Sequence, residues 1–494
     1  MRKILLGTTA VIGAALLAPM SAMAQDGGGG RSSVVVNPAS PDGANYGRVG
    51  GPALTPGDVT VRVGGYFAGW YSHTTQSNPN TIGGATPIAP NGSTGVVSAS
   101  SAAPQAGTGS TKTGKNDFHS DAEIHVYVDG KAANGLRYGA VLEMTFNGSE
   151  GTSPASGRRT FSFKTGALMD EMYAYAALPG LGQIRFGDED GSVGLMTTGV
   201  VTGFGTGGVY GSWQNSVIRP NRTTTSPGDL GDNTKLIYLS PQLFGFDVGV
   251  SYALNSNTGA NNGCVTSYAV YSCDRTYAST GATANGIQSW SDLPQRRQET
   301  QAVLRYRGQF GPVGVAASVG HVGWASIRDM TTTGTMMKTL RPGNVWMTGA
   351  QASAYGFTLG AMYQWGQSNY YWGSQARGDQ NMSQWTVGGT YTMGPITVGG
   401  NAFWGNYAGS NGFSFNGTSG AYTRNTNGTQ FPMRRSGISA GANYRLAPGL
   451  DLVAEYVRHT VREGGNNALS GAGSSVNQDK LRADVIIVGT RLAF

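Results

Sequence analysis

The chain has 494 residues, of which 79 are Gly, 12% are charged and 10% are aromatic, and its formal net charge at pH 7 is +7. The basic residues are scattered singly along the chain, which argues against a nucleic-acid partner. No stretch has the pattern of a long amphipathic helix. Gly, Tyr, Thr, Val and Asn dominate, a mixture typical of strands joined by polar loops.

The first 24 residues have the features of a cleaved secretory signal peptide. Arg2 and Lys3 are basic, residues 4–18 are apolar, and Ala22-Met23-Ala24 fits the small-x-small cleavage rule, so we expect cleavage after Ala24. A retained anchor helix would need a longer apolar run. Cleavage removes two basic residues and lowers the net charge from +7 to +5. No other long apolar run occurs, so we expect any membrane insertion to use strands.

Residues 25–57 are rich in Gly, Pro, Ser and Asn, which predicts a flexible leader. From Val59 the chain repeats one unit, in which two strands joined by a tight turn are followed by a long polar loop. Gly and Pro mark nearly all of these turns. The seven tight turns are Asp129–Asn134, Leu178–Gly182, Ser240–Leu243, Gly308–Pro312, Ala354–Tyr355, Met393–Pro395 and Ala447–Gly449.

Seven hairpins, an opening strand at Val59–Tyr71 and a closing strand at Arg482–Phe494 predict sixteen strands in total. An even strand count, with short turns at one end and long loops at the other, is typical of a bacterial outer-membrane barrel. We therefore predict an all-β fold, a 16-stranded antiparallel transmembrane β-barrel over residues 58–494. Its short turns would be periplasmic and its long loops extracellular.

Alternation along the strands supports this fold. Ile184 and Phe186 oppose Gln183 and Arg185, and several other strands show the same two faces. A charge facing lipid at mid-depth costs about 2–4 kcal/mol, so we assign the polar face to a wet lumen. In segments 235–239 and 313–322, either set of alternate residues could face the lumen. The expected inward charges on the wall are Arg62, Arg137, Arg185, Arg305, Arg307, Arg435 and Arg445.

A soluble β-sandwich or a secreted adhesin would also show alternating strands. Sixteen strands without a domain break, charges on the inner face and a strand ending at the terminal Phe494 disfavour that alternative. Small residues at inward positions favour open space over a packed interior. These positions are Gly64, Gly139, Gly249 and Gly441.

The only two cysteines, Cys264 and Cys273, lie in a polar segment without strand alternation. An exported protein meets an oxidising compartment, so we expect a disulfide within a loop. Two cysteines without a nearby His do not make a metal site.

The signal peptide, the strand count, the terminal strand VIIVGTRLAF and the segment GLGQIRFGDEDG resemble the Gram-negative general diffusion porins, in particular the alphaproteobacterial type. Thr490 and the long leader depart from that pattern. The resemblance implies an outer-membrane homotrimer for passive diffusion of small hydrophilic solutes and ions, with the third long loop folded inward to narrow the pore. It further implies outer-membrane lipid, lipopolysaccharide and the barrel assembly machinery as partners, with Phe494 as the terminal assembly signal.

The third long loop spans residues 188–232 and opens with Asp188, Glu189 and Asp190. If these acids face the wall arginines, they would set a transverse field that orients polar solutes at a constriction. Two alternatives remain open. The acids are either solvated loop charges or ligands of Ca²⁺, which suits acid-rich loops containing Gly. Acids on the wall would mute the field by pairing with the arginines; they are Glu123, Glu143, Glu171, Asp247 and Glu455.

No catalytic constellation is present, so an enzyme is not expected. The five histidines are scattered, and neither an HExxH motif nor a G-x-S-x-G motif occurs. Two other functions remain open, a solute-specific channel for sugars or anions and a non-conducting structural or adhesin barrel. We expect the tryptophans of the second half to form an interfacial girdle instead of a sugar slide. They are Trp324, Trp346, Trp365, Trp372, Trp385 and Trp404.

Overall fold

The computed structural model describes residues 56–76, 84–85, 106–107, 114–146, 168–217, 234–255, 277–278, 297–325, 328–330, 336–337, 340–368, 375–376, 379–408, 413–416, 421–424, 433–463 and 479–494. The expected signal peptide at 1–24, nearly all of the leader at 25–57, Cys264, Cys273 and Trp372 lie outside the described residues. Within the described part of the chain, no helix is long and apolar enough to cross a membrane.

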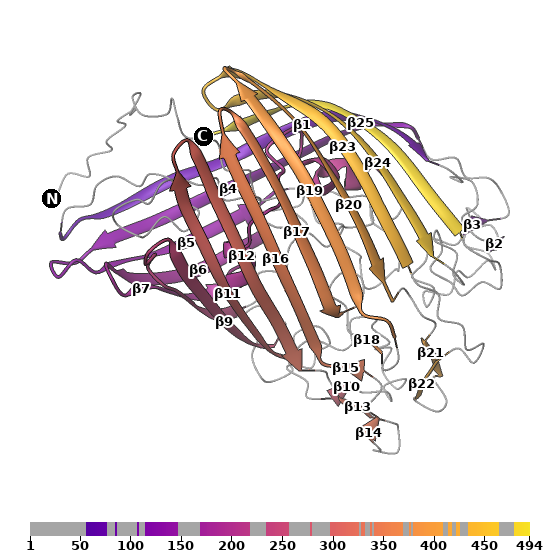
Figure 1. Ribbon diagram of the computed structural model, residues 1–494, viewed down its shortest axis with the longest axis horizontal. Coiled ribbons are helices and arrows are strands. Elements are labelled where there is room, and N and C mark those ends of the chain that lie inside the picture. The colour runs from indigo at the N-terminus through magenta and orange to yellow at the C-terminus, as the bar shows by residue number, and fades with distance from the viewer. Residues whose placement is uncertain are drawn as a thin grey trace, which may run out of the picture.

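Sixteen strands form one closed antiparallel barrel, as predicted (Figure 1). They are β1 (Val59–Gln76), β4 (Asn116–Lys131), β5 (Arg137–Thr145), β6 (Leu168–Leu178), β7 (Gly182–Asp188), β8 (Thr234–Leu239), β9 (Phe246–Asn255), β11 (Arg297–Phe310), β12 (Val313–Ala325), β16 (Gly343–Ala354), β17 (Phe357–Gln367), β19 (Met382–Met393), β20 (Ile396–Tyr407), β23 (Met433–Ala447), β24 (Leu450–Glu463) and β25 (Asp479–Ala493).

Within the described residues, several of the long loops carry short pieces of strand. These pieces are β2 (Gly84–Ala85), β3 (Ala106–Gly107), β10 (Tyr277–Ala278), β13 (Arg328–Met330), β14 (Met336–Met337), β15 (Leu340–Arg341), β18 (Gln375–Ala376), β21 (Phe413–Asn416) and β22 (Ala421–Arg424).

The barrel closes by pairing of its first and last strands. β1 runs antiparallel to β25 with Tyr66 opposite Ala493. The backbone N–H of Gly65 donates to the carbonyl of Phe494 at 3.0 Å, and the N–H of Phe494 donates to the carbonyl of Gly65 at 3.1 Å. Closure leaves no open sheet edge, which is the requirement for strands surrounded by lipid.

All seven predicted tight turns connect consecutive barrel strands at one end of the barrel. The turn between β16 and β17 shows why the local sequence specifies them. Tyr355 and Gly356 have φ values of 51° and 83°, as a two-residue hairpin of the primed type requires. Because Gly adopts positive φ without a steric penalty, the second of these positions suits it.

The two faces of the strands are those that the alternation predicts. On β7, Ile184 and Phe186 are 51% and 62% exposed on the outside, whereas the inward Arg185 is 3% exposed. For the segment 235–239, packing inside the barrel decides which side chains point inward. Ile237 and Leu239 point inward and are fully buried in a cluster with residues of the third loop.

Several aromatic side chains lie together on the outer face of strands β16, β17, β19 and β20. Trp346, Trp385 and Trp404 are exposed there, and the ring of Trp385 stacks on Tyr363 at a centroid distance of 4.2 Å. This arrangement agrees with a girdle at a membrane interface. The prediction was wrong for Trp324, because its side chain is buried inside the barrel in the same apolar cluster as Ile237 and Leu239.

Candidate functional site

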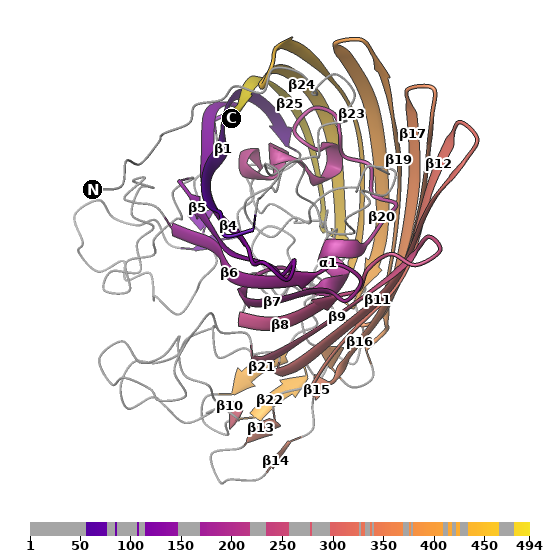
Figure 2. The ribbon, with the colours of Figure 1, turned by 90° about the vertical axis from the view of Figure 1, so that its left-hand side faces the viewer.

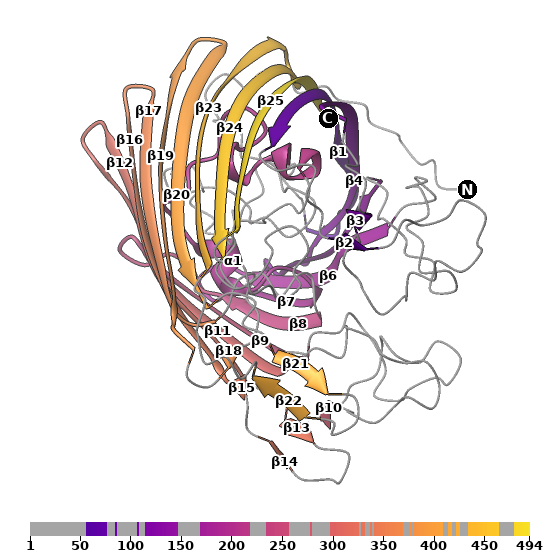
Figure 3. The ribbon, with the colours of Figure 1, turned by 90° about the vertical axis from the view of Figure 1, so that its right-hand side faces the viewer.

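The third long loop, as far as residue 217, lies inside the barrel (Figures 2 and 3). It contains one short helix, α1 (Ser192–Met196), and two short 3₁₀ helices, η1 (Gly208–Tyr210) and η2 (Ser212–Ser216). Gly187 is the turning point before the loop, with φ of 139°, and an added Cβ there would lie 2.3 Å from the carbonyl oxygen of Met172. Only glycine fits this close approach of β6 and β7.

The first part of the loop is attached to β9 and β11. The N–H of Ser192 donates to the hydroxyl of Ser251 at 3.1 Å, and the N–H of Val193 donates to Oε1 of Gln301 at 2.9 Å. The first N–H groups of a helix have no partner within the helix, so these wall side chains satisfy them. Val193 and Met196 are fully buried on the apolar part of the wall.

The middle of the loop follows the wall from β12 to β20. The N–H of Thr198 donates to the hydroxyl of Ser318 at 3.0 Å. Asn401 uses both ends of its amide, since Nδ2 donates to the carbonyl of Val201 at 3.0 Å and Oδ1 accepts from the N–H of Val209 at 2.9 Å. A single wall side chain thus fixes the two ends of this stretch.

The carboxylate of Glu455 on β24 holds the next part of the loop. It accepts hydrogen bonds from the N–H of Thr206 and, at 3.1 Å, from the N–H of Gly208. Asn443 on β23 accepts from the N–H of Gly205 at 2.6 Å. The Thr206 hydroxyl also lies 3.2 Å from this carboxylate, so one side chain contacts three hydrogen-bonding groups of the segment.

The last described part of the loop reaches β24, β25 and β1. Trp213 is fully buried against Val457, Val485 and Ile487. The hydroxyl of Ser216 lies 2.8 Å from that of Ser72 on β1. From α1 to Ser216, the loop therefore runs along the inner wall from β9 round to β1.

Tyr210 at the end of η1 is buried, and its hydroxyl is hydrogen-bonded to Thr386 on β19. Burial raises the pKa of the Tyr210 phenol above its ordinary value of 10.0, because the phenolate would lose its hydration. The side chain is therefore a neutral part of the loop attachment.

The three acids at the start of the loop lie at its root and are not open to the lumen as a row. Asp188 accepts a hydrogen bond from Thr234. Glu189 is fully buried and pairs with Arg185 at 3.2 Å, and Asp190 is buried beside Gly194. Their part in ion selectivity stays a prediction. Ca²⁺ binding by these acids also stays a prediction; among the described residues, their three carboxylates do not converge as a group of side-chain ligands.

All seven wall arginines occupy inward positions of their strands, and most have an acidic partner on the wall. Arg62 pairs with Asp129 at 2.8 Å. Arg445 approaches Asp451 at 3.9 Å. The guanidinium of Arg435 lies 6.0 Å from the ring centroid of Tyr407. Arg137, at the start of β5, pairs in the ladder with Lys131.

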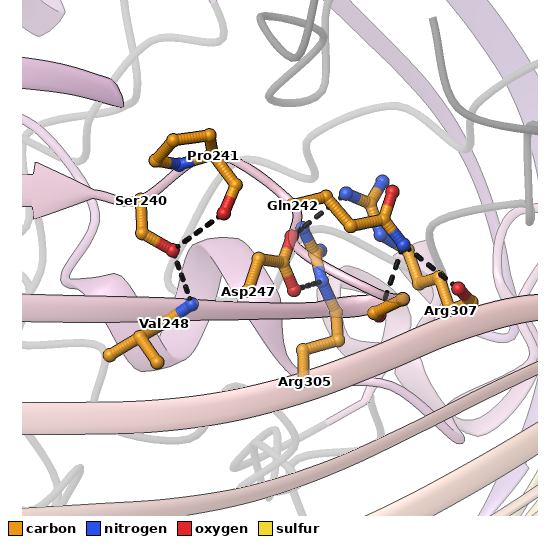
Figure 4. Close-up of polar contacts among 8 residues, drawn as sticks. Ser240, Pro241, Gln242, Asp247, Val248, Arg305 and Arg307 are labelled. Atoms are coloured by element: carbon orange, nitrogen blue, oxygen red, sulfur yellow. Dashed lines mark hydrogen bonds and ion pairs between the residues drawn. The ribbon is translucent and has the colours of Figure 1, made fainter. Parts of the chain in front are cut away.

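Asp247 on β9 joins two of these arginines (Figure 4). Its carboxylate lies 2.6 Å from Arg305 and 2.8 Å from Arg307 on the neighbouring strand β11. Figure 4 also shows Gln242, whose amide donates to the backbone carbonyl of Arg307 at 2.8 Å. The expected pairing of a wall acid with arginines is observed at Asp247, whereas Glu455 binds loop backbone.

The inward glycines do not mark open space, contrary to the prediction. A Cβ on Gly249 would lie 2.4 Å from the sulfur of Met196, and one on Gly441 would lie 3.1 Å from Phe204. At Gly139 it would meet Val128 and Tyr175, and at Gly64 it would lie 3.2 Å from the carbonyl oxygen of Phe494. These glycines admit loop side chains or neighbouring strands, so their small size reflects close packing.

Of the residues that attach the loop, only Glu455 was singled out in the sequence, as an acid expected to pair with arginines. All of them share one signal, an uncharged polar or acidic side chain at an inward position away from the strand ends. They are Ser251, Gln301, Ser318, Asn401, Asn443 and Glu455.

A family model described as Gram-negative porin matches residues 8–466 of the chain. None of the curated proteins compared with the chain matches it. Among solved structures, the chain is similar to OmpT of Vibrio cholerae in its trimer form, with 12% identity, a TM-score of 0.46 and coverage of 88% of this chain and 99% of that one. It is also similar to the anion-selective porin from Comamonas acidovorans, with 13% identity, a TM-score of 0.46 and coverage of 88% and 100%.

Proposed function

The chain belongs to the Gram-negative porin family, and from that premise we propose that residues 188–217 form the constriction of an outer-membrane pore for small hydrophilic solutes and ions. The observation that carries this proposal is the attachment of the loop along the inner wall, from Ser251 on β9 to Ser72 on β1. A loop held at so many points would keep one shape while solutes pass. Passive diffusion needs such a fixed and water-filled opening.

Weak ion selectivity accompanies this function. The wall carries arginines, but Asp129, Asp247, Glu189 and Asp451 lie within ion-pair distance of five of them. Paired charges of opposite sign produce a smaller net field than isolated ones, so neither anions nor cations would be strongly favoured.

The test is conductance of the purified protein in a planar bilayer under a salt gradient. Large stepwise openings with a small reversal potential would support a general diffusion pore. Absence of conductance would contradict the proposal, and small steps blocked by one class of solute would replace it with a solute-specific channel.

The acids at the start of the third loop contribute to the ion selectivity of the pore. Replacing Asp188, Glu189 and Asp190 by their amides removes negative charge near the constriction, so the reversal potential should shift toward anion preference. Asp117→Asn, at an exposed position on β4, is the control and should leave it unchanged. An unchanged reversal potential in the triple variant would remove these acids from the selectivity mechanism.

The functional unit is a homotrimer, as the family resemblance implies. Its outward apolar face would contact outer-membrane lipid and lipopolysaccharide, and the terminal Phe494 would be recognised by the barrel assembly machinery. Conductance steps that occur in threes, together with a trimer mass in detergent, would support the assembly. A monomer mass with single independent steps would exclude it.

A further inference from the structure

Three potential metal ligands converge on the inner face of β4 and β5. Glu123 and His125 are two residues apart on β4, so their side chains share the inward face. Glu143 on β5 is the direct antiparallel partner of His125. Strand periodicity and ladder register therefore bring two carboxylates and one imidazole together.

The distances suit a single metal ion. Nε2 of His125 lies 2.9 Å from Oε2 of Glu123 and 3.8 Å from Oε2 of Glu143. The three ligand atoms lie within 4.8 Å of one another. Ligands at the usual zinc distances in tetrahedral geometry are about 3.3 Å apart, which is between the two distances to His125.

The surroundings orient the imidazole and leave one ligand atom unsatisfied. Nδ1 of His125 is 2.9 Å from the hydroxyl of Tyr127, and this contact turns Nε2 toward the carboxylates. A second partner of this kind is usual for a histidine that binds metal. Glu123 is fully buried, and its Oε1 has no hydrogen-bond partner. A buried carboxylate oxygen in this state is costly unless a cation or proton satisfies it.

We propose that Glu123, His125 and Glu143 form a binding site for a divalent transition-metal ion of the zinc class. The imidazole is a borderline nitrogen ligand, so this mixed set of one nitrogen and two carboxylates suits Zn²⁺ or Co²⁺ better than Mg²⁺ or Ca²⁺, which prefer ligands that are all oxygen. Three protein ligands leave one tetrahedral position for water. The side chain of His125 is 16% exposed and those of the two acids almost fully buried, so the ion enters past the histidine.

Bound metal would change permeation, because it adds two positive charges to a wall that also carries Asp121 and Glu171. Cation permeability should fall and the reversal potential should move toward anions. The existence of the site does not depend on the proposed function, since binding is measured separately from conductance.

The first experiment is calorimetric titration of the chelator-treated full-length protein in detergent with Zn²⁺, and with Mg²⁺ for comparison. One Zn²⁺ per chain is expected, with no Mg²⁺ binding in the same concentration range. His125→Gln and Glu143→Gln should each weaken Zn²⁺ binding at least tenfold. His321→Gln is the matched control, because this histidine lies on the outer face beside Trp346, and it should bind like the parent.

Tyr127→Phe tests the orientation of the imidazole. Loss of a partner that orients a metal ligand typically weakens metal binding about 10–100-fold. We expect Tyr127→Phe to weaken Zn²⁺ binding less than His125→Gln does. Co²⁺ bound to the parent protein should give the intense visible absorption of tetrahedral coordination, and that band should be absent in His125→Gln.

Two results would overturn the proposal. One is the absence of Zn²⁺ and Co²⁺ binding to the parent protein, which needs no variant and therefore cannot arise from misfolding. The other is equal Zn²⁺ affinity of the parent and His125→Gln when both show the same heat-dependent mobility in gels. If binding is confirmed but conductance does not respond to Zn²⁺, the site stands and its effect on permeation is rejected.

Discussion

Gly199 of the third loop lies directly against Gly360 of β17, and neither position has room for a side chain. A Cβ on Gly360 would lie 2.7 Å from the carbonyl oxygen of Gly199, and a Cβ on Gly199 would lie 2.1 Å from the carbonyl oxygen of Ala361. The same close approach recurs at Gly349, where a Cβ would lie 1.9 Å from the carbonyl oxygen of Thr198. The loop backbone therefore rests directly on the wall backbone at this level.

Gly199→Ala should lower the unit conductance, because the added methyl group pushes the loop away from the wall and into the lumen. Gly199 also has φ of 100°, where a side chain is strained by about 1–3 kcal/mol. Gly203→Ala is the control, since nothing lies within 4 Å of its added Cβ. Single-channel recording compares the two variants, and equal conductance in both would show that the loop is not held as described.

Glu455→Gln should increase current fluctuations in the open channel. The parent carboxylate accepts from the N–H groups of Thr206 and Gly208, whereas an amide presents its own N–H groups to one side of that site. Leaving one buried N–H group of the loop unsatisfied costs about 1–3 kcal/mol, which is enough to populate detached loop states. Thr460→Ala, at an outward position on the same strand, is the control and should leave the current fluctuations unchanged. Equally increased fluctuations in both variants would indicate a general change in the barrel.

Asp247→Asn should destabilise the barrel by about 3–5 kcal/mol, because it leaves Arg305 buried without its carboxylate partner. The temperature at which the folded band disappears in gel electrophoresis should fall. Asp117→Asn is the matched control. Asp117 is exposed near the start of β4 and accepts a hydrogen bond from the N–H of Phe118 at 2.8 Å, so a change of about 0–0.5 kcal/mol is expected there. Equal shifts in the two variants would contradict a special role for Asp247.

Tyr210→Phe should make the protein more resistant to alkaline unfolding. Burial raises the pKa of the Tyr210 phenol in the folded protein above its ordinary value of 10.0. In the unfolded chain the phenol ionises near that value, so its contribution to stability is complete below about pH 10 and decreases as the pH rises further. The free energy of unfolding measured from pH 8 to 12 should decline less in Tyr210→Phe than in the parent. Parallel declines would show that Tyr210 does not contribute.

The sequence was sufficient to predict the barrel because its signals are local. A strand has a period of two residues, so Ile184 and Phe186 are separated from Gln183 and Arg185 by the alternation alone. A turn such as Tyr355-Gly356 is specified by the conformational preference of two residues. Strand count, inward arginines and closure between the first and last strands follow from adding such local signals around the barrel.

The path of the third loop, and with it the candidate constriction, was decided only by the tertiary structure. Glu455 and Thr206 are 249 residues apart, and no local pattern links a carboxylate on one strand to backbone N–H groups on a distant loop. The loop also changes the barrel interior, which the alternation alone predicts to be polar and open. It allows apolar Ile237 and Leu239 to face inward, and it fills the space beside Gly249 and Gly441. Periodicity fixes which way a side chain points, whereas its partner depends on segments that only folding brings together.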